Sequence, residues 1–315
     1  MSDSSGSETP RAEPLGTLVK VVDPKDEIDS QVVADIINPS TYELKVDVVC
    51  FRGDQQRNER FMSHVLSLGK HLLKANEHRR RYLRDEETLS ERLLAEAANT
   101  NGSSDYGEEY VELDAAFDSF MVELKAALDD LAKLLDPLFG IKLGAWRKGD
   151  HPQHGKQLSG ARVLLALENN LPSELSDRST RLREYVAGSL VPLSELVALR
   201  DNPVHRGGTK NVTPLVYLRG EGRVQRRHLV FGPRRAEPLT DFMDRVIRDV
   251  VTFCSQFMVG AIVVAAPDGL VLRRDLRGWG WKLEQSAFAP SLDESTETAP
   301  NQAAGPPVSG PSASS

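Results

Sequence analysis

Cysteine is scarce in this sequence: two residues of 315, Cys50 and Cys254, lie far apart in the chain. They form no spacing typical of metal ligands, so we interpret both as small core residues of a protein in a reducing cytoplasm. The N-terminal stretch MSDSSGSETPRAEP also lacks the apolar segment of a signal peptide. Secretion is therefore not expected.

Long apolar runs are missing as well. The most apolar stretch, FMVGAIVVAA at 257–266, is too short to span a bilayer and is closed by Pro267 and Asp268. We expect a buried helix end or a strand there, and no membrane partner.

The chain has no excess of positive charge, because its formal net charge is −7. This balance does not indicate a nucleic-acid partner, which would have to be held by a local basic patch. With 40% hydrophobic and 27% charged residues, the composition is typical of a soluble globular protein.

Both ends of the chain lack residues that a core could bury, so residues 1–13 and 285–315 are predicted to be disordered. Residues 14–53 are expected to form a small β or extended region. In TYELKVDVVCF, at 41–51, apolar and charged side chains alternate as in a half-buried strand, and GTLVKVV at 16–22 is its expected partner.

Residues 54–284 carry helical periodicity and predict an all-α fold, a mostly antiparallel helical bundle. Helices are expected at 54–98 and 110–138, with others beginning at Pro172 and near Pro238. The clearest apolar stripe reads Tyr110, Leu113, Phe117, Phe120, Leu124, Leu128, Leu131, Leu135 and Leu138.

The stretch ELVALRDNPVHRGG contains the candidate catalytic residues. Arg200 continues the apolar stripe of Leu193 and Leu196, so it falls on the buried face of its helix, where a guanidinium must be paired or must line a cavity. Pro203 disfavours helical geometry at the residue before it and lets the chain turn. After such a turn Arg200 and His205 can face one cavity.

Arginine and histidine together suit phosphodiester cleavage without a metal ion. Histidine exchanges a proton near neutral pH, here with a ribose 2′-hydroxyl or a leaving 5′-oxygen. Arginine presents a fixed charge to the phosphate oxygens in the transition state. No metal site or cofactor is expected: His151 and His154 are three apart, but Pro152 prevents a helix from aiming them together, so we expect a solvated loop.

At RDNPVH the sequence resembles the HEPN family, all-helical bundles whose signature is an arginine, a polar residue and, a few residues later, a histidine. The resemblance covers about residues 110–266. It implies that Arg200 stabilises the phosphate, that Asp201 orients the arginine, and that His205 is the acid/base. Many members are metal-independent endoribonucleases, often in toxin–antitoxin or phage-defence systems, and they commonly dimerise so that two motifs form one site. Others have lost catalysis and serve as binding modules. From the resemblance we therefore expect a homodimer, with a protein partner or antitoxin as a further expectation.

Spacing alone does not single out this motif, because three other pairs share it. The pairs are Arg57/His64, Arg147/His154 and Arg223/His228. We expect the first at the start of a solvated helix, the second in a loop, and the third in a strand with its side chains on opposite faces. The alternative for Arg200 and His205 is a satisfied arginine at a helix end beside a surface histidine.

A β-hairpin is expected at about 213–231, around the turn Gly220-Glu221-Gly222. Its basic run at 219–235 is typical of a groove for an RNA backbone; a solvated hairpin or an interface for an acidic partner is the alternative. HRRRYLRDEE, at 78–87, is balanced by acids, and we interpret it as a solvated helix face. The candidate RNA-binding residues are Arg206, Arg219, Arg223, Arg226, Arg227, Arg234 and Arg235.

Overall fold

The computed structural model describes residues 24–37, 50–51, 54–99, 106–108, 110–201, 212–230, 236–266, 270–274 and 281–285. This part of the chain is mostly helical, with a few short antiparallel strand pairs, which confirms the expected all-α class. The helices are α1 (Glu27–Val32), the π-helix η3 (Val33–Ile37), α4 (Gln55–Asn99), α5 (Val111–Lys133), α6 (Leu135–Phe139), α7 (Ala161–Asn169), the 3-10 helix η4 (Ser173–Leu175), α8 (Thr180–Asp201) and α9 (Leu239–Ala265).

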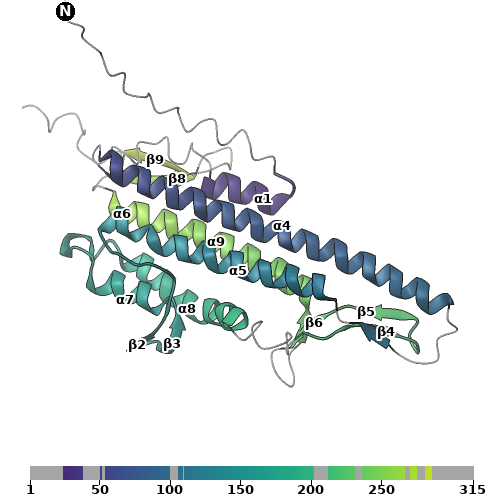
Figure 1. Ribbon diagram of the computed structural model, residues 1–315. Helices are drawn as coiled ribbons and strands as arrows, with labels where there is room; N and C mark the ends of the chain where they lie inside the picture. Colours follow the sequence, from purple (N-terminus) through teal and green to yellow (C-terminus); the bar gives the residue numbers. More distant parts are fainter. Residues whose placement is uncertain are drawn as a thin grey trace, which may run out of the picture.

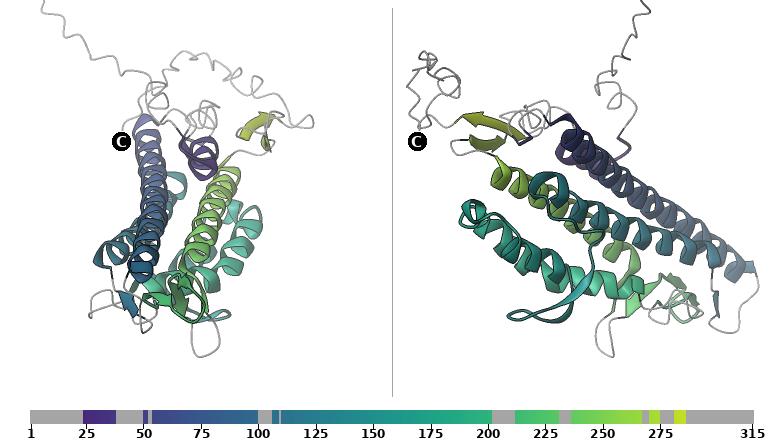
Figure 2. Two further views of the ribbon diagram at one scale, coloured as in Figure 1. Left: turned by 90° about the vertical axis from the view of Figure 1, so that its right-hand side faces the viewer. Right: turned by 60° about the vertical axis from the view of Figure 1, so that its left-hand side comes forward.

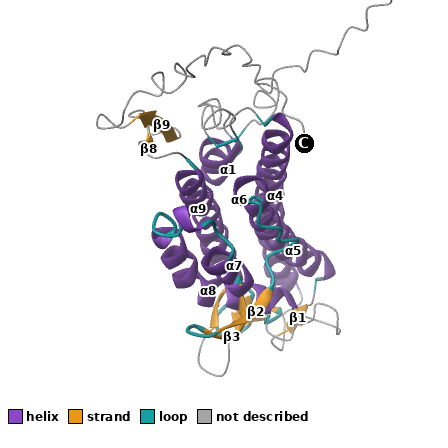
Figure 3. Cartoon of the chain, turned by 90° about the vertical axis from the view of Figure 1, so that its left-hand side faces the viewer, coloured by secondary structure: helices purple, strands orange, loops and turns teal. Residues whose placement is uncertain are grey.

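The strands form small sheets at the edges of the helical bundle (Figure 3). In one sheet β4 (Leu215–Leu218) lies between β1 (Tyr106–Glu108) and β5 (Arg223–Gln225). The other pairs are β2 (Lys148–His151) with β3 (Gly155–Ser159), β6 (His228–Val230) with β7 (Ala236–Pro238), and β8 (Leu270–Arg274) with β9 (Trp281–Gln285). The turn at Gly220-Glu221-Gly222 joins β4 to β5, as expected.

The long helices α4, α5 and α9 form the body of the molecule (Figure 1). Helix α1 packs against both α4 and α9, whereas α7 and α8 lie on the opposite side (Figure 2). All nine side chains of the stripe from Tyr110 to Leu138 are buried, as predicted. Phe242, Val246, Val250, Phe253 and Phe257 of α9 are buried too. Periodic apolar residues therefore identified the contacts on which the bundle depends.

Among the described residues, α9 is the one helix long and apolar enough to cross a membrane by length and composition. It extends well beyond the 257–266 stretch that the sequence singled out. Of its most apolar window, 61% is buried inside the bundle. The core helix of a soluble protein passes the same test, so this helix is weak evidence for a membrane span.

Part of the region expected to be β or extended is helical instead. Residues 27–37 form α1 and η3, with Asp26 as the N-cap, whose carboxylate accepts a hydrogen bond from the backbone N–H of Asp29 at 2.9 Å. Ile28, Val32 and Ile36 recur every four residues and are buried in the core. The strand predicted at 41–51 lies outside the described residues, apart from Cys50 and Phe51, which form a turn.

The segment expected to be a solvated loop around His151 is a hairpin, β2–β3, that packs on α7. His151 is only 4% exposed, and its Nε2 lies 2.9 Å from Glu168 Oε2. The ring of His154 lies 4.6 Å from that of His151. The loop interpretation was wrong because the burial of His151 depends on Glu168, a partner 17 residues away in sequence.

Candidate functional site

The proposed motif begins at the C-terminal end of α8. Arg200 and Asp201 are the last two residues of this helix, while His205 and Arg206 lie outside the described residues. Leu193 and Leu196, on which the buried-stripe argument rested, are buried. The chain is described again from Val212, where an antiparallel bridge to Leu229 begins. Both flanks of the motif are thus attached to the bundle.

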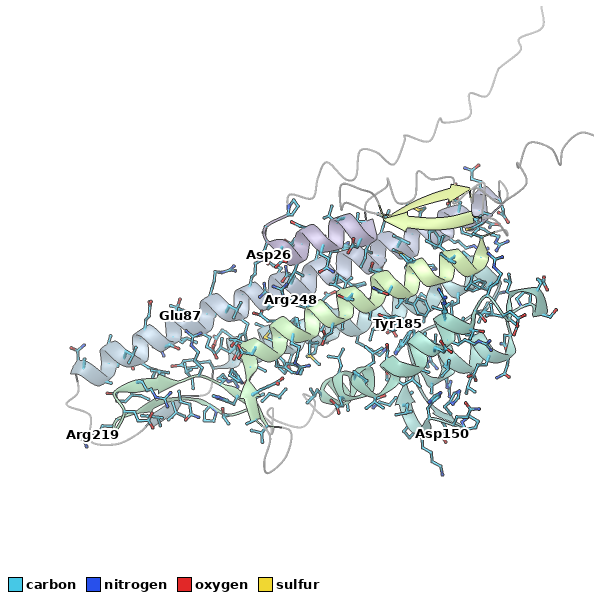
Figure 4. The ribbon with its side chains drawn as sticks, turned by 180° about the vertical axis from the view of Figure 1, so that it is seen from behind. Asp26, Glu87, Asp150, Tyr185, Arg219 and Arg248 are labelled. Carbon is cyan, nitrogen blue, oxygen red and sulfur yellow. The ribbon has the colours of Figure 1, made fainter. Side chains whose placement is uncertain are left out.

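A groove lies between α8 and α9, next to the end of α8. It has a volume of about 320 Å³ and reaches Leu199, the residue before Arg200. Tyr185 lies on the side of α8 that faces α9, and its ring stacks on Phe253 at 5.5 Å (Figure 4). The lining also includes Leu193, Leu196, Phe242, Val246 and Val250.

Arg57 of the first competing pair has a structural role. Its guanidinium donates hydrogen bonds to the backbone carbonyls of Pro137, at 2.6 and 2.9 Å, and Leu138, at 3.2 Å. It therefore satisfies carbonyls at the end of α6 that have no partner within the helix. Burial lowers the pKa of His64, the other member of this pair.

The other two pairs belong to hairpins. Arg223, on β5, forms an ion pair of 2.5 Å with Glu221, and Nδ1 of His228, on β6, donates to the carbonyl of Arg226 at 2.8 Å. The backbone carbonyl of Arg147 accepts a hydrogen bond from Gly160 at 3.1 Å, which closes the hairpin that contains His154. These positions are explained by local structure, without reference to a phosphate.

Two candidate RNA-binding arginines are paired with acids of the same chain, Arg227 in the interior and Arg226 at the surface. Arg227 is 3% exposed; its Nη2 lies 2.6 Å from Asp114 Oδ1, and its Nε donates to the carbonyl of Thr213 at 3.2 Å. Arg226 pairs with Glu87 on α4. The prediction that Arg227 contacts RNA is wrong for this structure, because a buried guanidinium cannot reach a phosphate backbone. Its sequence neighbours gave no sign of the partner, which lies on α5.

The remaining basic candidates occupy different positions. Arg219 lies at the tip of the β4–β5 hairpin, at the opposite end of the molecule from Asp150 (Figure 4). Arg223 is on the same hairpin and largely exposed. Arg234 and Arg235 lie outside the described residues. The hairpin therefore presents Arg219 and Arg223 to solvent, but not Arg227.

A buried acid accompanies Arg227. Glu86 is fully buried on α4; it accepts hydrogen bonds from the hydroxyl of Tyr82 at 3.1 Å and the backbone N–H of Arg227 at 3.3 Å. Burial raises the pKa of Glu86, and burial also raises the pKa of Tyr82. The sequence analysis missed this cluster, although the spacing of four between Tyr82 and Glu86 places both side chains on one helix face.

A second ionic cluster joins α1 to α4. Arg80 donates to Asp26 at 3.0 Å and to Asp29 at 2.8 Å, and Asn76 donates to both carboxylates. Burial alone would raise the pKa of Asp26, but hydrogen bonds from Asp29, Asn76 and Arg80 lower it overall. Arg79 extends the cluster to Asp244 on α9. The segment 78–87 is thus not simply a solvated face, because several of its charges hold elements together.

Within the residues that the structure describes, no three His, Cys, Asp or Glu side chains are grouped so that they could hold a metal ion. Comparison with protein-family models, curated proteins and solved structures finds no match to the chain.

Proposed function

We propose that the protein is a HEPN-like, metal-independent endoribonuclease whose site is built from Arg200, Asp201 and His205. The observation that carries the proposal is the position of the motif. Arg200 and Asp201 end a helix whose buried stripe leads to them, and Arg57 of one competing pair has a structural role, because it donates to backbone carbonyls at the end of α6. The proposal therefore rests on the place of RDNPVH at the end of the buried stripe of α8 and on its resemblance to the HEPN signature.

In the proposed reaction His205 accepts the proton of a ribose 2′-hydroxyl as its oxygen attacks the adjacent phosphorus. The bond from phosphorus to the 5′-oxygen of the next nucleotide breaks, and that oxygen leaves with a proton. The products are a 2′,3′-cyclic phosphate and a 5′-hydroxyl. Arg200 balances the charge that develops on the phosphate oxygens, and Asp201 orients Arg200.

A homodimer completes this proposal, because the motif of a second copy supplies the acid that protonates the leaving oxygen. Arg219 and Arg223, on the exposed hairpin, are the described residues proposed to attract the RNA backbone, with Arg206, Arg234 and Arg235 as further candidates. A cytoplasmic role in a toxin–antitoxin or defence setting is part of the same proposal.

The test is to incubate the wild-type protein and the His205→Ala variant with total RNA in EDTA, and then to analyse the RNA ends. We expect wild type to produce cyclic phosphate ends and His205→Ala to produce none, with an unchanged circular dichroism spectrum. His228→Ala is the matched control, because it removes the histidine of a competing pair, and it should cleave like wild type. Full activity in His205→Ala, or loss of wild-type activity in EDTA, would contradict the proposal.

The second candidate function is a non-catalytic binding module on the same fold. It is favoured by the pairing of Arg226 and Arg227 with acids, which reduces the positive surface available to RNA. Folded wild-type protein that leaves total RNA intact, with or without added Mg²⁺, would favour this module over the nuclease.

A further inference from the structure

The groove between α8 and α9 is an opening between two antiparallel helices that are close together at one end. A Cβ added to Gly260 of α9 would lie 3.1 Å from Leu182 Cδ1 of α8, so the helices approach closely there, with the Leu182 side chain packed on the glycine. Further along, the groove extends from Tyr185 to Leu199 on α8, beside Phe242 to Phe253 on α9. At 1.5 Å per residue this is about 16 Å on α9, or about three helical turns.

The groove stays open because α8 presents small or short side chains to it. Gly188, Ser189 and Pro192 line the α8 wall, and a Cβ added to Gly188 would have no heavy atom within 4 Å. The floor is apolar, with Val246 and Val250 of α9 among its residues. An elongated apolar groove of this length suits the apolar face of a helix.

The rim of the groove is acidic. Glu195 is exposed on the α8 side and Asp249 on the α9 side. Among the described residues that line the groove, the one cation is Arg245, and it is already engaged, because it lies 2.5 Å from Glu237 and 3.9 Å from Asp249. These three carboxylates against one guanidinium disfavour an anionic ligand such as RNA and favour a cationic one.

We propose that this groove binds a basic amphipathic helix of a partner protein. Apolar side chains at positions i, i+3 or i+4, and i+7 of that helix enter the groove, and its lysines or arginines lie against Glu195 and Asp249. The apolar floor provides the affinity, and the acidic rim selects for positive charge.

The probe is a fluorescent synthetic peptide of roughly 16 residues, with leucines at alternating spacings of three and four and lysines between them. We expect it to bind wild-type protein with an increase in anisotropy, and a matched peptide with glutamate in place of lysine to bind about tenfold or more weakly. Gly188→Leu should weaken lysine-peptide binding about tenfold or more by filling the groove. This variant should fold, because there is open space at Gly188 and leucine is the better helix former.

Charge reversal provides the second pair of variants. Asp249→Lys should weaken binding of the lysine peptide severalfold, whereas Glu91→Lys, an exposed acid on α4, should not change it. Equal binding to Gly188→Leu and wild type, or equal binding of the two peptides, would overturn the proposal. A dimer of wild type that Gly188→Leu converts to a monomer would assign the groove to a second copy, which also overturns it. All these measurements are independent of RNA cleavage, so failure of either proposal leaves the other intact.

Discussion

The substitution Arg227→Met tests whether Arg227 stabilises the fold or binds RNA. The substitution keeps the aliphatic part of the buried side chain but removes the ion pair with Asp114 and the hydrogen bond to the carbonyl of Thr213. Removing one partner of a buried ion pair costs about 3–5 kcal/mol. Because the side chain of Asp114 is 31% exposed and is hydrated in the variant, we expect a loss near the lower end, about 3 kcal/mol.

The assay is urea unfolding monitored by circular dichroism, supported by thermal melts. A loss of about 3 kcal/mol corresponds to a fall of about 6–12 °C in the melting temperature for a domain of this size. Arg223→Met is the matched control: its ion pair with Glu221 is exposed, so stability should change by less than about 0.5 kcal/mol. Asp114→Asn in the Arg227→Met background should recover part of the loss, since it removes the negative charge that has lost its ion pair with Arg227.

The reasoning would be refuted if Arg227→Met left stability within about 0.5 kcal/mol of wild type and instead weakened RNA binding with a salt slope reduced by about one. That result would mean that Arg227 contacts phosphate. Reduced RNA cleavage together with a large stability loss would not support a phosphate contact, so both properties are measured on the same preparation.

Three further predictions concern the core. Burial raises the pKa of Glu86 above its unfolded value of about 4.5, so the folded state holds this proton more tightly and stability falls as pH rises through the folded pKa. In urea titrations the stability of Glu86→Gln relative to wild type should therefore increase as the pH rises above about 4.5; a difference that stays constant with pH would contradict this. Gly69→Ala should lower the free energy of unfolding by about 1–2 kcal/mol in the same assay, because the new methyl group would overlap Ile37. An unchanged free energy of unfolding would show that η3 moves to make room for the methyl group. Cys254 is fully buried, which raises its thiol pKa, so Ellman's reagent should modify it only after unfolding.

The sequence predicted α4, α5 and α9 well because their packing depends on local periodicity. The helix predicted to begin at Pro172 begins at Thr180 instead, after the 3-10 helix η4. The start of α9 after Pro238 agrees with the prediction. The 45-residue α4 also matches its predicted range closely, although its apolar stripe is narrow. Each of these faces repeats over many turns, so its position needs no knowledge of distant residues.

Prediction from the sequence was wrong for residues whose burial depends on a partner distant in the chain. Glu86 and Arg227 are 141 residues apart, and each alone is typical of a solvated surface. The prediction for residues 27–37 was wrong for a different reason. The helical segment is short, and its aliphatic residues suit a strand as well as a helix. Of the candidate site, Arg200 and Asp201 end α8, where the apolar stripe of that helix predicted them, and His205 lies outside the described residues.

The buried side chain of Arg227 connects α5 to the stretch that follows the motif in the chain. Arg227 binds Asp114 on α5 and the carbonyl of Thr213, which follows the motif in the chain. The chain enters the motif from α8, whose buried stripe fixes its end against the bundle. Arg227, a candidate RNA ligand in the sequence, thus binds Thr213 at one end of the segment that contains His205. In the proposed nuclease, its contribution to cleavage would come through the position of that segment. Arg227→Lys provides the test of this step, because it keeps the charge near Asp114 but loses the forked geometry that also reaches Thr213. We expect it to retain most of the stability that Arg227→Met loses, and to lower the turnover number more than the affinity for RNA.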